Sequence, residues 1–138
     1  MNAASKKVQT IYLILLLFNT LAVSLIWGIN TLFLLVAVLT YGDAFRANAF
    51  FTVGMLLFEI PTGVVADFRG RRLSYLLGTS TLAFSTFLYL VMWSWAAPFW
   101  GWAIASTLLG LGFTFFSGAV EAWLVDALAY HKFKGDLE

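Results

Sequence analysis

GVVADFRGRRLSY, residues 63–75, is a short basic segment that separates two long apolar stretches. No charged residue occurs from Val8 to Gly42, and none occurs from Leu73 to Val120. A helix needs only about 20 apolar residues to cross the hydrocarbon core of a bilayer. The second charge-free run is too long for one such helix and suits two helices joined by a turn. The sequence therefore predicts several membrane spans whose charges gather in the connections.

The composition indicates a membrane protein independently of this segment. Residues of the AVILMFWYC set make up 62% of the chain, and charged residues make up 11%. Soluble domains contain roughly 45–50% apolar and about 25% charged residues. A chain this poor in polar side chains lacks the surface that a water-soluble fold needs, so we expect the lipid bilayer to surround it. Cysteine is absent, which excludes disulfides and thiolate-bound metals.

Two breaks divide the apolar stretches into four predicted spans. One break is Tyr41-Gly42-Asp43, and the other is a tight turn at residues 93–98, where four tryptophans surround Pro98. Proline interrupts helices, and Trp prefers the membrane interface. The predicted spans run over about 9–40, 44–66, 73–93 and 99–126. Because backbone polar groups in lipid must bond within their own segment, each span should be helical, which predicts an all-α membrane protein with four transmembrane helices.

Lys and Arg are distributed unevenly between the two sides of the predicted membrane. Those expected on one side are Lys6, Lys7, Arg69, Arg71, Arg72, Lys132 and Lys134, and only Arg46 lies on the other side. Short loops rich in Lys and Arg stay in the cytoplasm. We therefore expect a multi-pass protein of the plasma or inner membrane, with both termini in the cytoplasm and residues 93–98 outside.

The basic segment resembles the loop between the second and third helices of major facilitator superfamily transporters. The family pattern is Gly-x-Leu-Ala-Asp-Arg-x-Gly-Arg-Lys/Arg, with an apolar residue three places later. The matching positions in this chain are Gly63, Ala66, Asp67, Gly70, Arg71 and Arg72. Val65 stands where the family has Leu, and Phe68 replaces the first Arg of the pattern. Residues 117–126, SGAVEAWLVD, also look like the end of the fourth helix in part of the superfamily.

This resemblance implies a twelve-helix fold of which the chain is an incomplete N-terminal half, with the remaining helices of the transporter missing. It implies alternating-access transport of a small-molecule substrate, coupled to an ion or to protons, with efflux as the favoured direction. It further implies that Asp67 and Arg71 hold helices together while the inner gate is shut, with Asp126 as the partner carboxylate. The alternative is that the charges only set topology, which explains the arginines and leaves Asp67 unexplained.

Two more acidic residues lie inside predicted spans. Glu59 lies eight residues before Asp67, and Glu121 lies five before Asp126, so they lie about 12 Å and about 7 Å deeper. A carboxylate at that depth is costly and suggests an ion or substrate pathway, here one that could carry a proton. The alternative for Glu59 is a bond to polar groups freed by Pro61. Neither acid is accompanied by a nucleophile or a metal-binding cluster, so we expect neither an enzyme nor a cofactor.

Polar and small residues recur along one side of three predicted spans. In the first span Asn19, Trp27 and Asn30 fall on one stripe at ~100° per residue. An amide that faces lipid has no partner, so we expect this stripe to line the substrate path. The small residues at three- and four-residue steps are Ser74, Gly78, Thr81 and Ser85 in the third span and Ser106, Gly110, Thr114 and Ser117 in the fourth. The small residues of the third span indicate helix packing. Those of the fourth span lead to Glu121, so they fit either packing or a cavity wall.

Two other classes of membrane protein also have four helices. Small multidrug-type carriers form one such class, and a resemblance to them implies an essential glutamate in the first helix. This chain has no glutamate from Val8 to Gly42. A small membrane subunit or scaffold without transport activity of its own also fits the length, and it would not need a functional Asp67 or Glu121. The mixed charges of residues 127–138 do not favour nucleic-acid binding.

Overall fold

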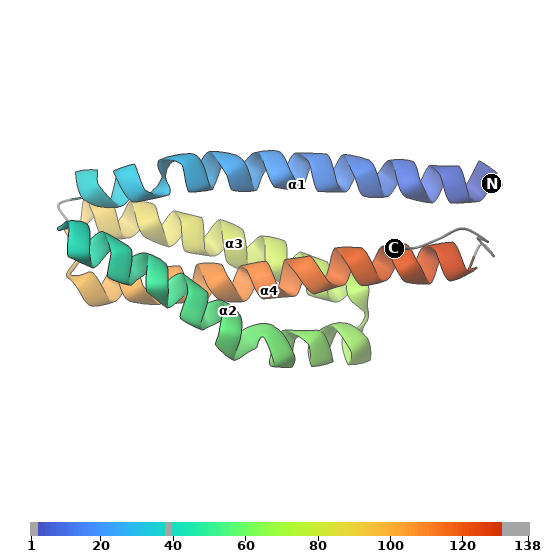
Figure 1. The fold of residues 1–138 in the computed structure, drawn as a ribbon. Helices are drawn as coiled ribbons and strands as arrows, with labels where there is room; N and C mark the ends of the chain where they lie inside the picture. The colour runs from blue at the N-terminus through green and yellow to red at the C-terminus, as the bar shows by residue number, and fades with distance from the viewer. Residues whose placement is uncertain (1–2, 38–39, 131–138) are drawn as a thin grey trace.

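The computed structural model describes residues 3–37 and 40–130 of the chain. The helices are α1 (Ala3–Val36), α2 (Tyr41–Arg69), α3 (Arg71–Ser94) and α4 (Phe99–Tyr130), and they run lengthwise beside one another (Figure 1). Each is long and apolar enough to cross a membrane. The prediction of an all-α chain with four helices able to span a membrane is therefore confirmed.

The alternating direction of the helices gathers the basic residues at one end of the bundle. α1 and α3 begin there, and α2 and α4 end there (Figure 1). This basic end carries Lys6, Lys7, Arg69, Arg71 and Arg72. The opposite end, which we call the turn end, holds Arg46 and the connection from α3 to α4. Lys132 and Lys134 lie outside the described residues.

The connection between α1 and α2 is not where the sequence predicts it. Tyr41, Gly42 and Asp43 form the first turn of α2 instead of a break, and α1 ends at Val36. The reason is a helix cap, because the Thr40 hydroxyl accepts a hydrogen bond from the Asp43 backbone N–H at 3.2 Å. The carboxylate of Asp43 also favours a helix N-terminus. The predicted first span of 9–40 is therefore too long at its C-terminal end.

Residues 95–98 connect α3 to α4, within the predicted turn of 93–98. Ala96 adopts a left-handed φ of 47°, which lets the chain reverse within a few residues. Trp95 is exposed at this turn, but Trp102 is fully buried and its Nε1 donates to the Ala97 carbonyl at 3.1 Å. Trp102 therefore packs in the protein core, whereas Trp95 stays exposed.

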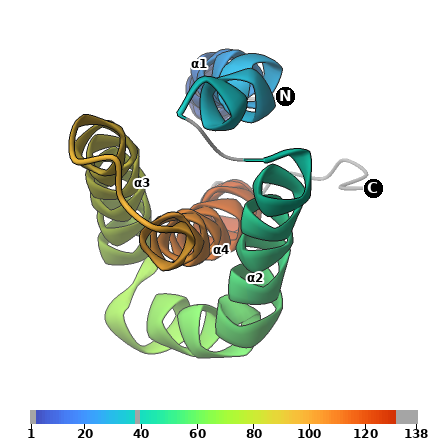
Figure 2. The same cartoon turned by 90° about the vertical axis from the view of Figure 1, so that its left-hand side faces the viewer.

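α4 is the central helix, and α2 and α3 pack along it from two sides (Figure 2). Glycines allow the helices to approach this closely. A Cβ at Gly54 of α2 would lie 2.6 Å from the Thr107 carbonyl oxygen, and one at Gly78 of α3 would lie 2.9 Å from the Phe116 nitrogen. Both neighbours are backbone atoms, so only glycine permits the observed separation of the helix axes.

The small residues of α3 form a packing surface, as the sequence predicts. The Ser74 hydroxyl donates to the Phe115 carbonyl at 3.0 Å, and the Ser85 hydroxyl donates to the Ala105 carbonyl at 2.6 Å. Both serines are almost fully buried against α4. Interhelical hydrogen bonds of this kind stabilise helix pairs in a bilayer, so α3 and α4 form one tightly joined unit.

The core lies at the turn end, where α1 joins the other helices. Its buried residues are Leu34, Ala37, Ala44, Ala47, Tyr89, Trp102 and Ala105. The ring of Phe33 extends this core, with its centroid 5.9 Å from that of Trp93 and 6.1 Å from that of Trp102. Toward the basic end α1 lies apart from the other helices (Figures 1 and 2), and cavities separate it from α3 and α4.

α2 changes direction partway along its length (Figure 1). Pro61 lies inside this helix and has no N–H to donate to the preceding turn. The neighbouring Thr62 hydroxyl bonds to two carbonyls, those of Phe58 at 2.8 Å and Glu59 at 3.1 Å. We attribute the bend to Pro61, because prolines are the commonest cause of a sharp change in helix direction.

Candidate functional site

Three charged side chains from three different helices meet at the basic end. The Nη1 atom of Arg71 lies 2.7 Å from Oδ1 of Asp67, and its Nε atom lies 3.5 Å from Oδ2 of Asp126. The side chain of Arg71 is 27% exposed, whereas both carboxylates are 65% exposed. Asp67 belongs to α2, Arg71 to α3 and Asp126 to α4, so one guanidinium links three helices. We call these three residues the charge network.

Gly70 determines the geometry of the charge network. Its backbone has φ 91° and ψ 151°, a combination that is essentially restricted to glycine. Its N–H donates to the Ala66 carbonyl at 3.1 Å, so α2 ends and α3 begins at this single residue. Asp67 therefore lies in the last turn of α2, four residues before Arg71. Gly63, the other glycine of the motif, is different because a Cβ there would meet nothing within 4 Å.

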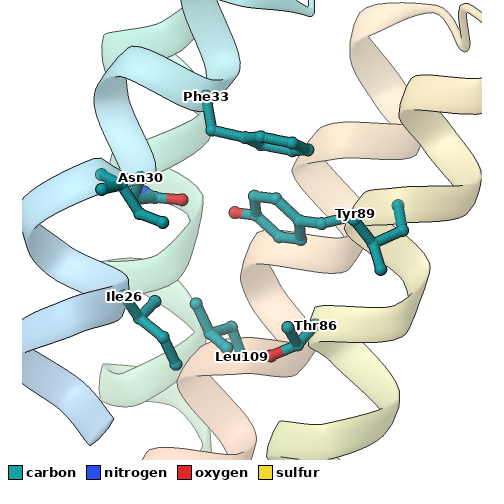
Figure 3. A pocket seen from close by; sticks show the side chains of 8 residues that line it. Ile26, Asn30, Phe33, Thr86, Tyr89 and Leu109 are labelled. Atoms are coloured by element: carbon teal, nitrogen blue, oxygen red, sulfur yellow. The ribbon is translucent and has the colours of Figure 1, made fainter.

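Near the middle of the bundle, a cavity of about 170 Å³ lies between α1, α3 and α4. Figure 3 shows its wall, with Asn30 and Ile26 from α1, Thr86 and Tyr89 from α3, and Leu109 from α4. The Tyr89 hydroxyl is 2.6 Å from the Ser106 hydroxyl of α4. This buried pair fixes the orientation of the tyrosine ring in the cavity wall.

A larger cavity of about 460 Å³ adjoins the first and shares Ile26 and Thr86 with it. Asn19 of α1 lines this cavity, is partly exposed, and bonds to no described residue. The hydroxyls of Thr79 and Thr86 are directed to carbonyls of their own helix, those of Tyr75 at 3.0 Å and Leu82 at 2.9 Å. Asn19 therefore offers the free amide of this cavity, while the threonine oxygens can still accept a hydrogen bond.

The predicted stripe on α1 divides between two surroundings. Asn19 lines the larger cavity, but Trp27 packs edge-on against Phe51 of α2, with ring centroids 5.1 Å apart. Asn30 lines the smaller cavity and donates its Nδ2 to Oδ1 of Asn48 on α2 at 2.7 Å. The whole stripe therefore does not line these two cavities. Trp27 and Asn30 hold α1 against α2, and only Asn30 of the two lines one of these cavities as well.

Three charged residues of the predicted site lie outside both the charge network and these two cavities. These are Arg72, Glu59 and Glu121, whose side chains are exposed and bond to no described residue. The alternative for Glu59, a bond to polar groups freed by Pro61, is not observed among the described residues, and the Thr62 hydroxyl donates to the carbonyls of Phe58 and Glu59 instead. On α4 the stripe of small residues packs near Ser106 and becomes exposed at Ser117 and Glu121. The described residues contain no cluster of His, Cys, Asp and Glu suited to a metal ion.

Several residues of the cavity region were not indicated by sequence reasoning. Tyr89 and Asn48 are the clearest cases, because Tyr89 lines the cavity and Asn48 accepts a hydrogen bond from Asn30. A lone amide in an apolar span is a signal that could have identified Asn48. Tyr89 carries no comparable signal, since aromatic residues are abundant throughout the chain.

Comparison with protein-family models, curated proteins and solved structures gives no match for this chain. The resemblance to the major facilitator superfamily consequently rests on residues 63–72 and 117–126.

Proposed function

We propose that the chain is the N-terminal four-helix portion of a major facilitator-type secondary transporter, which carries a small molecule across a membrane by alternating access. The observation that supports this most directly is the charge network. Asp67 and Arg71 come from the segment that resembles the family loop, and Asp126 is the fourth-helix carboxylate expected to meet them. Asp126 lies 55 residues after Arg71, so its contact with the guanidinium is not a consequence of local structure.

The strength of the charge network suits a gate that opens repeatedly. Exposed ion pairs contribute only about 0.2–1 kcal/mol each, and both carboxylates here are largely exposed. Two such contacts bias α2, α3 and α4 toward a closed arrangement without preventing its opening. A substrate or ion that favours the open arrangement by a few kcal/mol could then shift the population between the two.

The two adjoining cavities are the proposed path of the substrate within this portion. Among the described residues that line them, none carries a charge. Hydrogen-bonding capacity comes mainly from the Asn19 and Asn30 amides and from the hydroxyl of Tyr89. Such a wall favours a lipophilic, uncharged molecule with a few polar groups over an organic ion, because a charge placed there would lose its hydration without gaining a partner.

Coupling to protons is assigned in this proposal to Glu121, with Glu59 as the second candidate. Both side chains are exposed on apolar helices. A carboxylate on such a helix requires water, a proton or a polar partner in place of lipid. The helices that complete a transporter would supply those surroundings. The proposed direction of transport is export, which follows from the resemblance of residues 117–126 alone.

The proposed location is the plasma or inner membrane, with the basic end in the cytoplasm. Lys6, Lys7 and the arginines of the α2–α3 connection lie at this end, and Arg46 lies at the other. By the positive-inside rule the N-terminus and the end of α4 are then cytoplasmic. The turn at residues 95–98 faces outward.

The test is gradient-driven transport by the complete reading frame that contains this chain, assayed against a panel of lipophilic compounds. Asp67→Asn and Asp126→Asn should each reduce transport while leaving membrane expression intact, and the double variant should lose much less than the sum of the two effects. Asp43→Asn is the matched control, because it removes an ion-paired carboxylate at the turn end, 3.4 Å from Arg46.

Two results would overturn this proposal. Strict additivity of the Asp67 and Asp126 effects would show that the two carboxylates do not act through one guanidinium. A complete reading frame without further membrane spans, combined with absence of gradient-driven flux, would instead favour a four-helix membrane subunit or scaffold.

A further inference from the structure

A third cavity, of about 250 Å³, lies at the basic end between α1, α3 and α4. Arg71 and Arg72 form its basic side, and Leu15 of α1 and Val120 of α4 belong to its apolar side. Tyr75 and Trp123 complete the wall. None of the functions assigned above uses this cavity. It combines a cationic side with an apolar side, which is the complement of an amphiphile with an anionic head.

The two arginines of this cavity differ in whether a carboxylate neutralises their charge. Arg71 is held by the carboxylates of Asp67 and Asp126. Arg72 is exposed and forms no ion pair or hydrogen bond with a described residue. A guanidinium presents a planar array of donors that matches the oxygens of a phosphate group. Arg72 is therefore the cation available to an anionic ligand in this cavity.

The start of α3 adds to the attraction for an anion. Arg71 and Arg72 are its first two residues, and the N-cap residue Gly70 provides no side-chain hydrogen bond to the first turn. Uncapped N–H groups at a helix N-terminus carry a partial positive charge and bind phosphate oxygens readily. The helix terminus adds to the attraction for an anionic ligand, but the main evidence for such a ligand is the cavity with its two arginines.

The position of the cavity along the helices favours a lipid over a free anion. The cavity lies at the ends of the apolar spans, next to the basic α2–α3 connection. In a helix that spans a membrane, this position is at the level of the membrane interface. Tyr75 and Trp123 are amphipathic aromatic residues of the type that occupies this level. Leu15 and Val120 offer apolar contact on the membrane side, where an acyl chain would lie.

We propose that this cavity binds an anionic glycerophospholipid from the leaflet at the basic end, with its phosphodiester on Arg72 and an acyl chain along Leu15 and Val120. Basic pockets between membrane helices on the cytoplasmic side are suited to such headgroups. The inference depends on the chain spanning a membrane and does not depend on transport activity. A failure of the transport proposal would leave it intact.

The test uses the full chain purified in a neutral detergent and titrated with dioleoyl phosphatidylglycerol or dioleoyl phosphatidylcholine, with bound lipid counted by native mass spectrometry. The phosphatidylglycerol adduct should form at lower lipid concentration than the phosphatidylcholine adduct. Arg72→Gln should weaken phosphatidylglycerol binding about fivefold or more, since each basic residue near an anionic lipid contributes on this scale. Arg72→Lys, which keeps the charge, should recover a large part of the affinity.

Arg69→Gln is the matched control, because it removes an exposed arginine of the same connection that does not line the cavity. It should change the affinity for phosphatidylglycerol less than twofold. Equal binding of the two lipids would overturn the proposal, as would equal losses in Arg69→Gln and Arg72→Gln, which would indicate a diffuse basic surface. Displacement of the lipid by millimolar inorganic phosphate would assign the cavity to a free anion instead. Circular dichroism of each variant verifies that its helices are intact.

Discussion

Gly54→Ala should destabilise the bundle, because the backbone of α2 approaches the backbone of α4 closely at Gly54. A Cβ at this position would lie 2.6 Å from the Thr107 carbonyl oxygen, 3.1 Å from its Cα and 3.2 Å from its carbonyl carbon. Ordinary contacts to a Cβ begin near about 3.4 Å, so the two helices would have to separate by several tenths of an ångström. Overpacking of this kind costs about 1–3 kcal/mol. Because the obstacle is backbone, rotation of a side chain cannot relieve it.

Gly63→Ala is the matched control in the same helix. A Cβ there would meet nothing within 4 Å, and alanine is favoured over glycine in a helix by about 0.5–1 kcal/mol. We therefore expect Gly63→Ala to be neutral or slightly stabilising. The measurement is the free energy of unfolding in mixed micelles titrated with a denaturing detergent, followed by circular dichroism and Trp fluorescence. Equal effects of the two substitutions would refute the close approach of α2 and α4 at Gly54.

Three further predictions address the connections between helices. Gly70→Ala should destabilise the chain by about 1–3 kcal/mol in the same assay, because φ 91° with ψ 151° is strained for any other residue; wild-type stability would mean that the α2–α3 connection adopts another conformation. Asn30→Leu should lower the free energy of unfolding by about 0.6–2 kcal/mol, because it removes the 2.7 Å hydrogen bond to Asn48. Asn48→Leu should destabilise the Asn30→Leu variant less than it destabilises the wild type, whereas additive losses would contradict the pairing. In the cysteine-free chain, a membrane-impermeant thiol reagent should label Ser94→Cys but not Lys6→Cys in intact cells, and the reverse pattern would invert the proposed orientation.

Hydrophobicity and the spacing of charges account for the part of the fold that could be predicted. Long charge-free runs must be helical in lipid because their backbone groups can bond only within the segment. The turn around Pro98 was predicted for a related reason, since proline cannot continue a helix and interrupts the apolar run. The start of α2 was misplaced because Thr40 caps the helix through one hydrogen bond, a local effect that an apolar pattern does not contain.

The candidate site divides in the same way. The motif residues Asp67, Gly70 and Arg71 could be identified from the sequence, and so could Asp126 as their expected partner. The 3.5 Å contact between Arg71 and Asp126, in contrast, depends on how α4 packs between α2 and α3. Glu59 and Glu121 could likewise be selected from the sequence, but their surroundings could not, because depth along a helix does not determine which side faces a neighbour.

The sequence by itself therefore determined the element type, the approximate spans and the end at which the basic residues gather, because these follow from transfer free energies and helix geometry summed along one segment. Only the tertiary structure decided that α4 is central, that Trp102 is buried, that Asn30 binds Asn48, and that α1 leaves cavities beside α3 and α4. Those features arise from side chains of different helices meeting in space. Periodicity gives the direction of each side chain about its own helix axis, and the rotation and distance of neighbouring helices are set by packing among all of them.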